Sequence, residues 1–274
     1  MKPNSHLWTE KEIEKINKSL KNSRFGPVQY VNETGSTNTD LLEQISRGIP
    51  EGTVLVTDYQ KKGRGRLGRH WEAPPGKNLL FSVFLYPKMN LEKVSLTTPG
   101  LALALVDALE KYGLSAGIKW PNDVYLTDNH SGKVAGILAE VADTEIPAVV
   151  IGMGCNVAWP EAMNPELPDA VSILATGNKI QRSELLVNVL LGFEKYLLLL
   201  EQPNGQSEFR EIHLKKSITI GKNVRVHQPI GEISGLAIDV DAAGTLILEN
   251  NRGLHQIFAG DVTHAHIEAE ESKN

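Results

Sequence analysis

The pattern of apolar and polar positions along the chain predicts four helices. In the first of them Ile13, Ile16 and Leu20 recur at helical spacing, and Thr9 and Glu12 form a capping-box pair in front of them. A similar pair, Thr37 and Asp40, predicts the start of the second helix. The predicted helices cover residues 9–22, about 37–48, about 98–113 and 183–202, the last being the final long helix before Pro203.

Runs of β-branched and aromatic residues between these helices predict strands at residues 28–32, 53–59, 78–86, 118–126, 133–142 and 147–157. Beyond Phe209 the pattern changes to short strands separated by glycine turns, at residues 218–226, 232–240, 245–249 and 255–258. Closely spaced strands of this kind are typical of a small barrel. We therefore expect a domain boundary near residue 214, between a mixed α+β domain and a small all-β domain.

Composition narrows the class of protein. Of the 274 residues, 41% are hydrophobic and 22% charged, as is usual for a soluble globular protein, and the formal net charge of −5 argues against a general nucleic-acid binder. The single cysteine excludes an intramolecular disulfide and fits a reducing cytoplasm. Residues 1–12 lack the apolar core of a signal peptide, and polar residues interrupt the most apolar stretch, 185–200, so that we expect a buried helix rather than a membrane span.

The strongest chemical signal is the run Gly63-Arg64-Gly65-Arg66-Leu67-Gly68-Arg69-His70-Trp71. Its glycines allow the backbone to approach a ligand closely, and its arginines supply forked donors suited to phosphate or carboxylate oxygens. The loop is therefore suited to holding a polyanion. On the loop alone, a solvated arginine–glycine segment or a site for single-stranded nucleic acid is the alternative.

Four further segments carry weaker signals. Lys119-Trp120-Pro121-Asn122-Asp123 forms a stiff corner with a charge at each end, although a plain turn explains it equally well. Gly35-Ser36-Thr37-Asn38 offers either ligand contacts or ordinary helix capping. In Lys133–Glu140 and Ile151–Val157, glycines in apolar strands permit close backbone approach or serve packing.

In this order and spacing, the five segments resemble the biotin protein ligase family. The resemblance runs from about Tyr30 to Val157 and continues more weakly into the C-terminal region. It implies an α+β fold in which helices flank a mixed sheet, as in class II synthetases, followed by a small SH3-like β-barrel. The expected organisation is a helical extension at residues 1–27, a catalytic domain at 28–214 and the C-terminal domain at 215–274.

The resemblance also assigns roles by position. The residues expected to bind biotin are Ser36, Thr37, Asn38, Gln60, Gly63, Arg64, Gly65, Arg66, Lys133 and Gly136. Those expected to bind ATP are Arg66, Arg69, Trp71, Lys119, Asn122, Asp123, Lys133 and Asn156. We expect Arg64, Arg66, Lys119 and Lys133 to stabilise the charge that develops during catalysis. Leu67 stands where relatives carry another arginine, which puts one anion contact in doubt.

The implied reaction is the formation of biotinyl-5'-AMP from biotin and ATP with Mg²⁺, followed by transfer of biotin to a lysine of a biotin carboxyl carrier protein. Only about 27 residues precede the first catalytic strand, and they hold one predicted helix, whereas a DNA-binding helix-turn-helix needs two. We therefore expect a monofunctional ligase that acts in the cytoplasm without binding DNA or membrane.

Two alternatives stay open at this stage. The first is a nucleic-acid-binding module that uses the arginine loop, which salt-sensitive DNA retention without ATP turnover would favour. The second is a lipoate-type ligase on the same fold, which a comparison of the two acids as substrates would separate. Oligomeric state, metal ligands and the natural carrier are not fixed by the sequence, and a homodimer through an exposed sheet edge is one arrangement.

Overall fold

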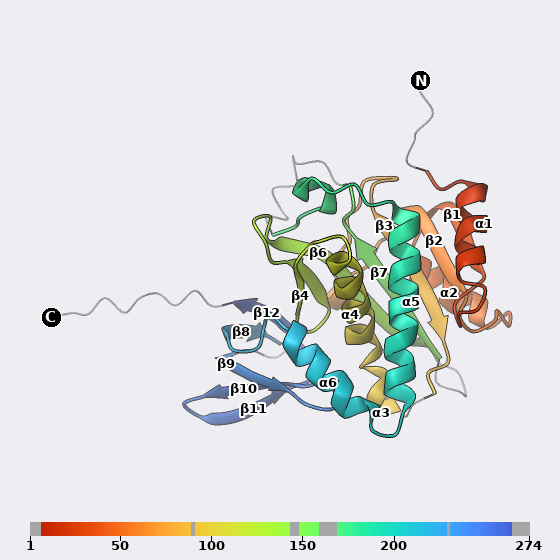
Figure 1. Cartoon of the computed structure of the whole chain (residues 1–274). Helices are drawn as coiled ribbons and strands as arrows, with labels where there is room; N and C mark the ends of the chain where they lie inside the picture. Colours follow the sequence, from red (N-terminus) through yellow and green to blue (C-terminus); the bar gives the residue numbers. More distant parts are fainter. Residues whose placement is uncertain (1–6, 89–90, 143–147, 159–168, 229–230, 265–274) are drawn as a thin grey trace.

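The structure, a computed structural model, describes residues 7–88, 91–142, 148–158, 169–228 and 231–264. A large α+β part is followed by a smaller β part (Figure 1). The helices are α1 (Glu10–Ser19), α2 (Thr37–Ile45), η1 (Arg66–Gly68), α3 (Leu91–Val94), α4 (Thr97–Glu110), η2 (Ile173–Thr176), α5 (Arg182–Glu201) and α6 (Gly205–Lys216).

The large part is built on a seven-stranded sheet, in the order β1-β2-β3-β7-β6-β5-β4. Its strands are β1 (Val28–Thr34), β2 (Val54–Gln60), β3 (Leu79–Leu85), β4 (Ala116–Lys119), β5 (Asp123–Leu126), β6 (Gly132–Ala142) and β7 (Ala148–Cys155). Only β1 and β2 pair in parallel, and all other neighbours are antiparallel. The predicted mixed sheet with flanking helices is confirmed.

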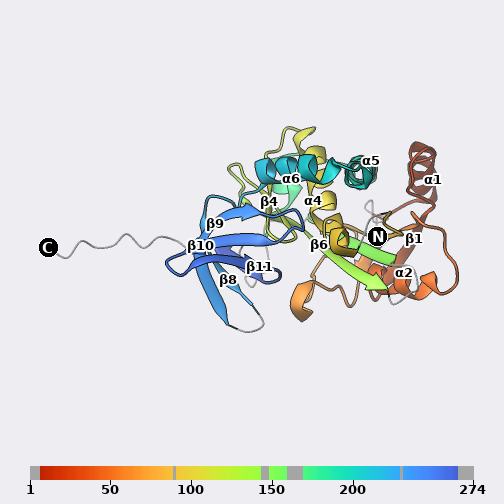
Figure 2. The same cartoon turned by 90° about the horizontal axis from the view of Figure 1, so that it is seen from below.

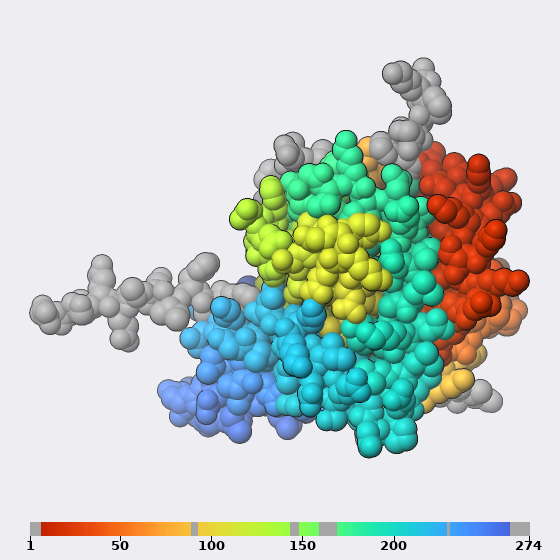
Figure 3. Space-filling model, viewed as in Figure 1, coloured from red at the N-terminus to blue at the C-terminus, as the bar shows by residue number. Residues whose placement is uncertain are grey.

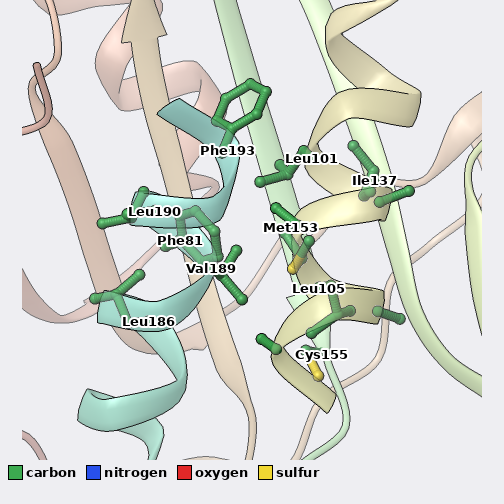
Figure 4. Packing of buried hydrophobic residues seen from close by; sticks show 14 of the residues in the cluster. Phe81, Leu101, Leu105, Ile137, Met153, Cys155, Leu186, Val189, Leu190 and Phe193 are labelled. Carbon is green, nitrogen blue, oxygen red and sulfur yellow. The ribbon is translucent and has the colours of Figure 1, made fainter. Parts of the chain in front are cut away.

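The sheet is covered on both faces, which explains why β3, one of its inner strands, is apolar at every position but Ser82. All seven residues of β3 are buried. Alternate residues of this strand, such as Phe81 and Val83, belong to the main core with α4 and α5, as the close-up of this packing shows (Figure 4). Phe84 points to the opposite face, where it packs with Leu41 and Ile45 of α2.

More helices cover one face of the sheet than the other. Viewed from below, α4, α5 and α6 lie on one side of the sheet and α2 on the other (Figure 2). In the space-filling view α4 and α5 form one continuous outer surface, and α6 separates it from the C-terminal strands (Figure 3). We therefore expect the ligand-binding residues on the less covered face, near α2.

The C-terminal part is a five-stranded antiparallel sheet in the order β11-β10-β9-β8-β12. Its strands are β8 (Asn223–His227), β9 (Glu232–Val240), β10 (Leu246–Asn250), β11 (Gly253–Ile257) and β12 (Asp261–His264). The predicted C-terminal β domain is thus confirmed. The predicted boundary at residue 214 falls in the last turn of α6, and the side chain of Leu214 packs against the core of this sheet.

Trp120 fastens the two parts together. Its indole is 4% exposed and belongs to the core of the C-terminal sheet, although the residue follows β4 of the large sheet. Its backbone N–H donates to Thr219 Oγ1 at 2.9 Å, and its Nε1–H donates to the carbonyl oxygen of Gly244 at 3.0 Å. One buried aromatic side chain therefore links the two sheets through both its ring and its backbone.

Several predicted boundaries were wrong. The prediction missed α6, although Phe209 and His213 are buried at helical spacing, and it missed β12. The predicted strand at 118–126 is two strands, β4 and β5, because Trp120–Asn122 turn between them. The segment 218–222 precedes β8 instead of opening it. Pro147, the predicted first residue of β7, lies outside the described residues.

The predicted cap of α2 was also wrong. The capping box at Thr9 and Glu12 of α1 is present. In α2, however, Ser36 occupies the N-cap position without a side-chain cap hydrogen bond. Asp40 instead accepts a hydrogen bond from Thr34 Oγ1 at 2.5 Å. The hydroxyl of Thr37 is thereby free of capping and points toward other partners, described below.

In the part of the chain that the structure describes, no helix is both long enough and apolar enough to cross a membrane. Cys155 is fully buried, and burial raises the pKa of its thiol to about 12. The expectation that Cys155 is a small core residue is confirmed.

The buried His213 predicts a pH-dependent stability. Burial lowers the pKa of its imidazole from 6.5 to about 4. As the pH falls below 6.5, the unfolded chain binds a proton that the folded chain refuses, so stability decreases down to about pH 4 and then levels, a total loss of at most about 3 kcal/mol. The His213→Leu variant should lack this contribution. Urea unfolding of both proteins between pH 7 and 4 measures it, and parallel pH profiles would contradict the prediction.

Candidate active site

One cavity, of about 210 Å³, lies between the start of α2, the loop after β2, and the strands β3, β6 and β7. Most of the predicted site residues line it. These are Ser36, Thr37, Asn38, Gln60, Arg64, Gly65, Arg66, Arg69, Trp71, Asn122, Asp123, Lys133, Gly136 and Asn156. Gly63 and Lys119 do not reach its wall. Residues from both predicted ligand groups therefore share one cavity.

The arginine-rich loop closes on itself beside this cavity. The N–H of Trp71 donates to the carbonyl of Gly63 at 2.9 Å, and the N–H of Gly65 donates to the carbonyl of Arg69 at 2.8 Å. A Cβ at Gly63 would lie 2.5 Å from the carbonyl oxygen of Trp71, so only glycine permits this approach. Gly63 thus shapes the loop without touching the cavity. At its tip, Leu67 has φ of 55° and is 57% exposed.

The loop ends with Trp71, whose indole lies on a floor of glycines. A Cβ at Gly154 of β7 would be 2.3 Å from Trp71 Cε2, and one at Gly136 of β6 would be 2.9 Å from its Cζ3. Gly136 and Gly154 are paired neighbours in the sheet. In the described part of the chain, the buried Nε1–H of Trp71 has no hydrogen-bond partner. The floor is glycine because a flat ring rests on it, and the indole nitrogen offers a donor to a ligand.

A cationic group also lies near the Trp71 indole. Lys133 Nζ lies 5.7 Å from the Trp71 ring centroid and 2.7 Å from Asp123 Oδ1. Lys119 is the cross-strand neighbour of Asp123 between β4 and β5, but it does not line the cavity. Burial lowers the pKa of Lys119, which makes its charge costly to keep without a nearby anion.

The hydrogen-bond partners of Arg66 are neutral. Its Nη1 donates to Asn122 Oδ1 at 3.3 Å and to the carbonyl oxygen of Gly260 at 3.2 Å, both neutral acceptors. Within the described residues it forms no ion pair, and burial lowers its pKa. Arg69, by contrast, pairs with Asp261 at the start of β12. A half-buried guanidinium held by neutral groups is suited to receive an anion.

The other end of the cavity is neutral and polar. The N–H of Thr37 donates to Gln60 Oε1 at 2.8 Å, and its hydroxyl lies 2.6 Å from Ser82 Oγ. Asn38 fits against the sheet because position 152 is glycine, where a Cβ would lie 2.3 Å from Asn38 Oδ1. The cavity therefore has one hydrogen-bonding end and one cationic end.

Asn156 is held by the sheet and is 1% exposed. Its Oδ1 accepts a hydrogen bond from Asn78 Nδ2 at 3.1 Å, and its backbone N–H donates to the carbonyl of Val134 at 2.8 Å. Any contact of Asn156 with a ligand would thus be made by a side chain that is already fixed in place.

Prediction from the sequence missed several residues of the cavity wall. Ser82, Phe81 and Met153 come from the strands, and Asp261 comes from the C-terminal sheet. Ser82 had a readable signal, because it is the only polar residue in the seven-residue apolar run of β3. Asp261 had none, since its place in the wall depends on how the two sheets meet.

Among the described residues there is no group of three or more His, Cys, Asp or Glu that could hold a metal ion. Arg64, Arg66 and Lys133 line the cavity, while Lys119 adds charge without lining it. Such a site can bind an acid at its polar end and bring its carboxylate against a phosphate at the cationic end.

Comparison with known proteins agrees with this geometry. Residues 30–156 match the Biotin/lipoate A/B protein ligase family, and residues 219–264 match the biotin protein ligase C-terminal domain. The sequence is 35% identical to the biotin--[acetyl-CoA-carboxylase] ligase of Mycobacterium tuberculosis, over 88% of this chain and 90% of that protein. It is 33% identical to the bifunctional ligase/repressor BirA of Bacillus subtilis, over 85% of this chain and 72% of that protein.

The solved structures agree as well. The biotin protein ligase from Aquifex aeolicus in complex with biotin and ATP superposes with a TM-score of 0.75 at 29% identity, covering 88% of this chain and all of that one. The fold and the cavity define a ligase of the biotin and lipoate class. Within that class, the chain belongs to the biotin protein ligase family.

The glycine floor gives a direct test of the site. In the Gly154→Ala variant the new methyl group would displace the Trp71 indole, so we expect ligand binding to weaken at least ~10-fold while the fold is retained. Isothermal titration with biotin and ATP measures the loss. Gly100→Ala is the matched control, because a Cβ there meets its nearest atom, Phe193 Cε2, at an ordinary 3.5 Å. Unchanged affinity in Gly154→Ala would remove Trp71 and its floor from the site.

Proposed function

We propose that this chain activates biotin as biotinyl-5'-AMP and then transfers the biotin to a lysine of a biotin carboxyl carrier protein. The observation that carries the proposal is the single cavity with a neutral polar end and a cationic end. The family relationship supports it, since the relatives named above are biotin protein ligases and the Aquifex aeolicus enzyme binds both biotin and ATP.

The first step joins two anions. A biotin carboxylate oxygen bonds to the α-phosphorus of ATP, and the bond from that phosphorus to the bridging oxygen breaks as pyrophosphate leaves. The wall must offset the repulsion between the reactants and the charge that develops. Arg64, Arg66 and Lys133 reach the cavity for this purpose, and Lys119 acts from the strand beside Asp123. No covalent enzyme nucleophile is required, and Cys155 is buried away from the reaction.

The two ligand groups keep their assignment as proposals, with Lys133 in both groups and Gly136 in the biotin group, while Ser82 is added and Lys119 does not line the cavity. Ser36, Thr37, Asn38, Gln60 and Ser82 would bind the ring of biotin at the neutral end, with Gly65, Arg64 and Arg66 of the loop beside them. Trp71, Asn122, Asp123 and Asn156 would contact the nucleotide, with Arg69 at the rim. Gly63 would act through the shape of the loop.

Magnesium fits this site only as a partner of the substrate. Mg²⁺ keeps several waters and binds through one or two carboxylates together with phosphate oxygens. Asp123 and Asp261 line the cavity, but each is paired with a cation, Lys133 and Arg69 respectively. Mg²⁺ would therefore be held chiefly by ATP, where it would neutralise charge on the leaving pyrophosphate.

The carrier protein would reach the cavity through a second hollow. A groove of about 580 Å³ lies between β6 and the C-terminal sheet, and it shares Arg66, Asn122, Ile137 and Leu138 with the cavity wall. Its rim exposes two large apolar side chains, Val141 (60%) and Phe258 (76%). We place the docking of the carrier domain there, where its lysine would reach the acyl carbon of the adenylate.

Two finer proposals concern assembly and compartment. Beyond Gly136, β6 pairs with β7 alone in the described ladders, which leaves an exposed sheet edge through which a homodimer would form. The cytoplasm is the proposed compartment, because it supplies ATP and keeps thiols such as Cys155 reduced.

The defining experiment is pyrophosphate release by the purified protein with ATP, Mg²⁺ and either biotin or lipoate. We expect release with biotin alone, followed by labelling of a single lysine when a carrier domain is added. Release with lipoate in place of biotin would assign the chain to the lipoate branch of the family. Absence of release with both acids would refute the proposal.

Arg66 should retain the adenylate. The Arg66→Ala variant loses an anion contact and the link from the loop to Gly260, so we expect biotin affinity to fall ~10-fold or more and biotinyl-AMP to leak into solution. A filter assay for released adenylate measures the leak. Lys61→Ala, which removes a lysine paired with Glu33 on the surface, is the control. Leakage equal to that of the wild type would disprove the role of Arg66.

A further inference from the structure

The arginine-rich loop, Gly63–Trp71, is joined to the sheet by two stems, the end of β2 and the residues before β3. The pairing of these strands ends with Thr57 opposite Leu80, and the chain beyond this pair forms the stems. There the N–H of Gly76 donates to the carbonyl oxygen of Asp58 at 2.9 Å. Contacts between the stems restrict how far the loop can move, because strand pairing no longer holds the chain at this point.

A buried ion pair connects the two stems. Arg182, the first residue of α5, donates from Nη1 to Asp58 Oδ1 at 2.7 Å and to the carbonyl oxygen of Asn78 at 3.1 Å. The side chain of Arg182 is 12% exposed, and that of Asp58 is 1% exposed. One guanidinium group therefore joins α5 to both stems. We call these three groups, the Asp58 carboxylate, the Arg182 guanidinium and the Asn78 carbonyl, the stem clasp.

The second oxygen of the Asp58 carboxylate is also bound. Asp58 Oδ2 accepts the hydroxyl of Tyr30 at 2.7 Å and the backbone N–H of Trp8 at 3.2 Å. Burial and the Asp58 carboxylate raise the pKa of Tyr30, so its hydroxyl keeps the hydrogen that it donates. The Trp8 ring centroid lies 4.8 Å from the guanidinium carbon of Arg182, and Trp8 is buried. The ion pair is thus held in place by neutral donors and an aromatic face.

The stems lead directly into the cavity wall. Asn78 is fully buried, and its Nδ2 donates to Asn156 Oδ1 at 3.1 Å. Gln60 follows two residues after Asp58 on the other stem. Asn156 and Gln60 line the cavity, whereas Asp58 and Arg182 do not. Arg182 can therefore affect a ligand only through the loop and the residues at its stems.

We propose that Arg182 is a positioning residue for the arginine-rich loop, which it holds at both stems so that the loop stays closed over the bound adenylate. The inference rests on the proposed function. A loop with fixed ends loses less conformational freedom when it orders over a ligand, so the ligand dissociates more slowly. Arg182 and Trp8 lie outside residues 30–156, so the clasp is not among the features that the family match covers.

A purely structural role of the ion pair would give a different result from a positioning role. Removing one partner leaves the other as a buried charge without compensation, which destabilises the fold. Removing both, in the double variant Asp58→Asn with Arg182→Met, leaves no buried charge, so we expect stability to return toward that of the wild type. Methionine donates no hydrogen bond, so the stems stay unconnected. A positioning role therefore predicts a loop defect that persists in the double variant.

The first measurement is limited trypsin digestion of the protein without ligand, with cleavage after Arg64, Arg66 and Arg69 followed by mass spectrometry. Digestion is carried out well below the unfolding temperature of each variant, which thermal unfolding determines. We expect cleavage of the loop to be ~10-fold faster in Arg182→Met and in the double variant than in the wild type, because the loop opens more often.

The second measurement is the rate at which synthetic biotinyl-AMP, bound in advance, leaves the protein in a filter assay. This rate should also rise ~10-fold in Arg182→Met and in the double variant, the effect of losing a charged, buried hydrogen bond at the stems. Because the adenylate is supplied, the result does not depend on the rate of its formation. Both measurements therefore report on the loop and not on the chemical step.

Arg24→Met is the matched control. Arg24 is 16% exposed and pairs with Glu51 and Glu201, which lie near the opposite ends of β2 and α5. This variant should be destabilised without faster cleavage of the loop or faster release of the adenylate. Wild-type cleavage and release in the double variant would overturn the proposal, and equal acceleration in Arg24→Met would do so too. Faster loop cleavage in the double variant of a protein that releases no pyrophosphate would instead contradict the proposed function and leave the stem clasp standing.

Discussion

The contact between the Trp71 indole and the two glycines beneath it is the constraint on which the site depends. Gly136 and Gly154 sit side by side in neighbouring strands, and any side chain at Gly154 would collide with the ring. Trp71 in turn closes the loop through its backbone bond to Gly63. The sheet thus positions the indole, the indole positions the loop, and the loop carries the arginines to the cavity.

This arrangement concentrates positive charge where water is partly excluded. A guanidinium or ammonium group in such a place is stable only if an anion completes its surroundings. The neutral partners of Arg66 and the lowered pKa of Lys119 both show that the described protein groups do not fully provide that anion. The same deficit that makes the site costly when empty favours a bound carboxylate and phosphate.

The two sheets are coupled at the site as well as at their packed interface. Trp120 buries its ring in the C-terminal core, and one residue along the chain from Pro121, Asn122 accepts a hydrogen bond from Arg66. Gly260 and Asp261 of the C-terminal part contact Arg66 and Arg69 directly. A shift of the small sheet would therefore move the loop, which would connect the proposed docking groove to the cavity.

The sequence by itself determined the order of most elements, the change from a mixed α+β part to a C-terminal β part, and the segments that meet at the cavity. It did so because apolar periodicity reports burial, and because glycine and arginine at fixed spacing carry a local meaning. Only the tertiary structure decided that Thr37 serves the cavity instead of capping α2, that Ser82 and Asp261 belong to the wall, and that Gly63 and Lys119 do not. These outcomes depend on which side chains meet from strands far apart in the chain, and a local sequence pattern does not predict such contacts.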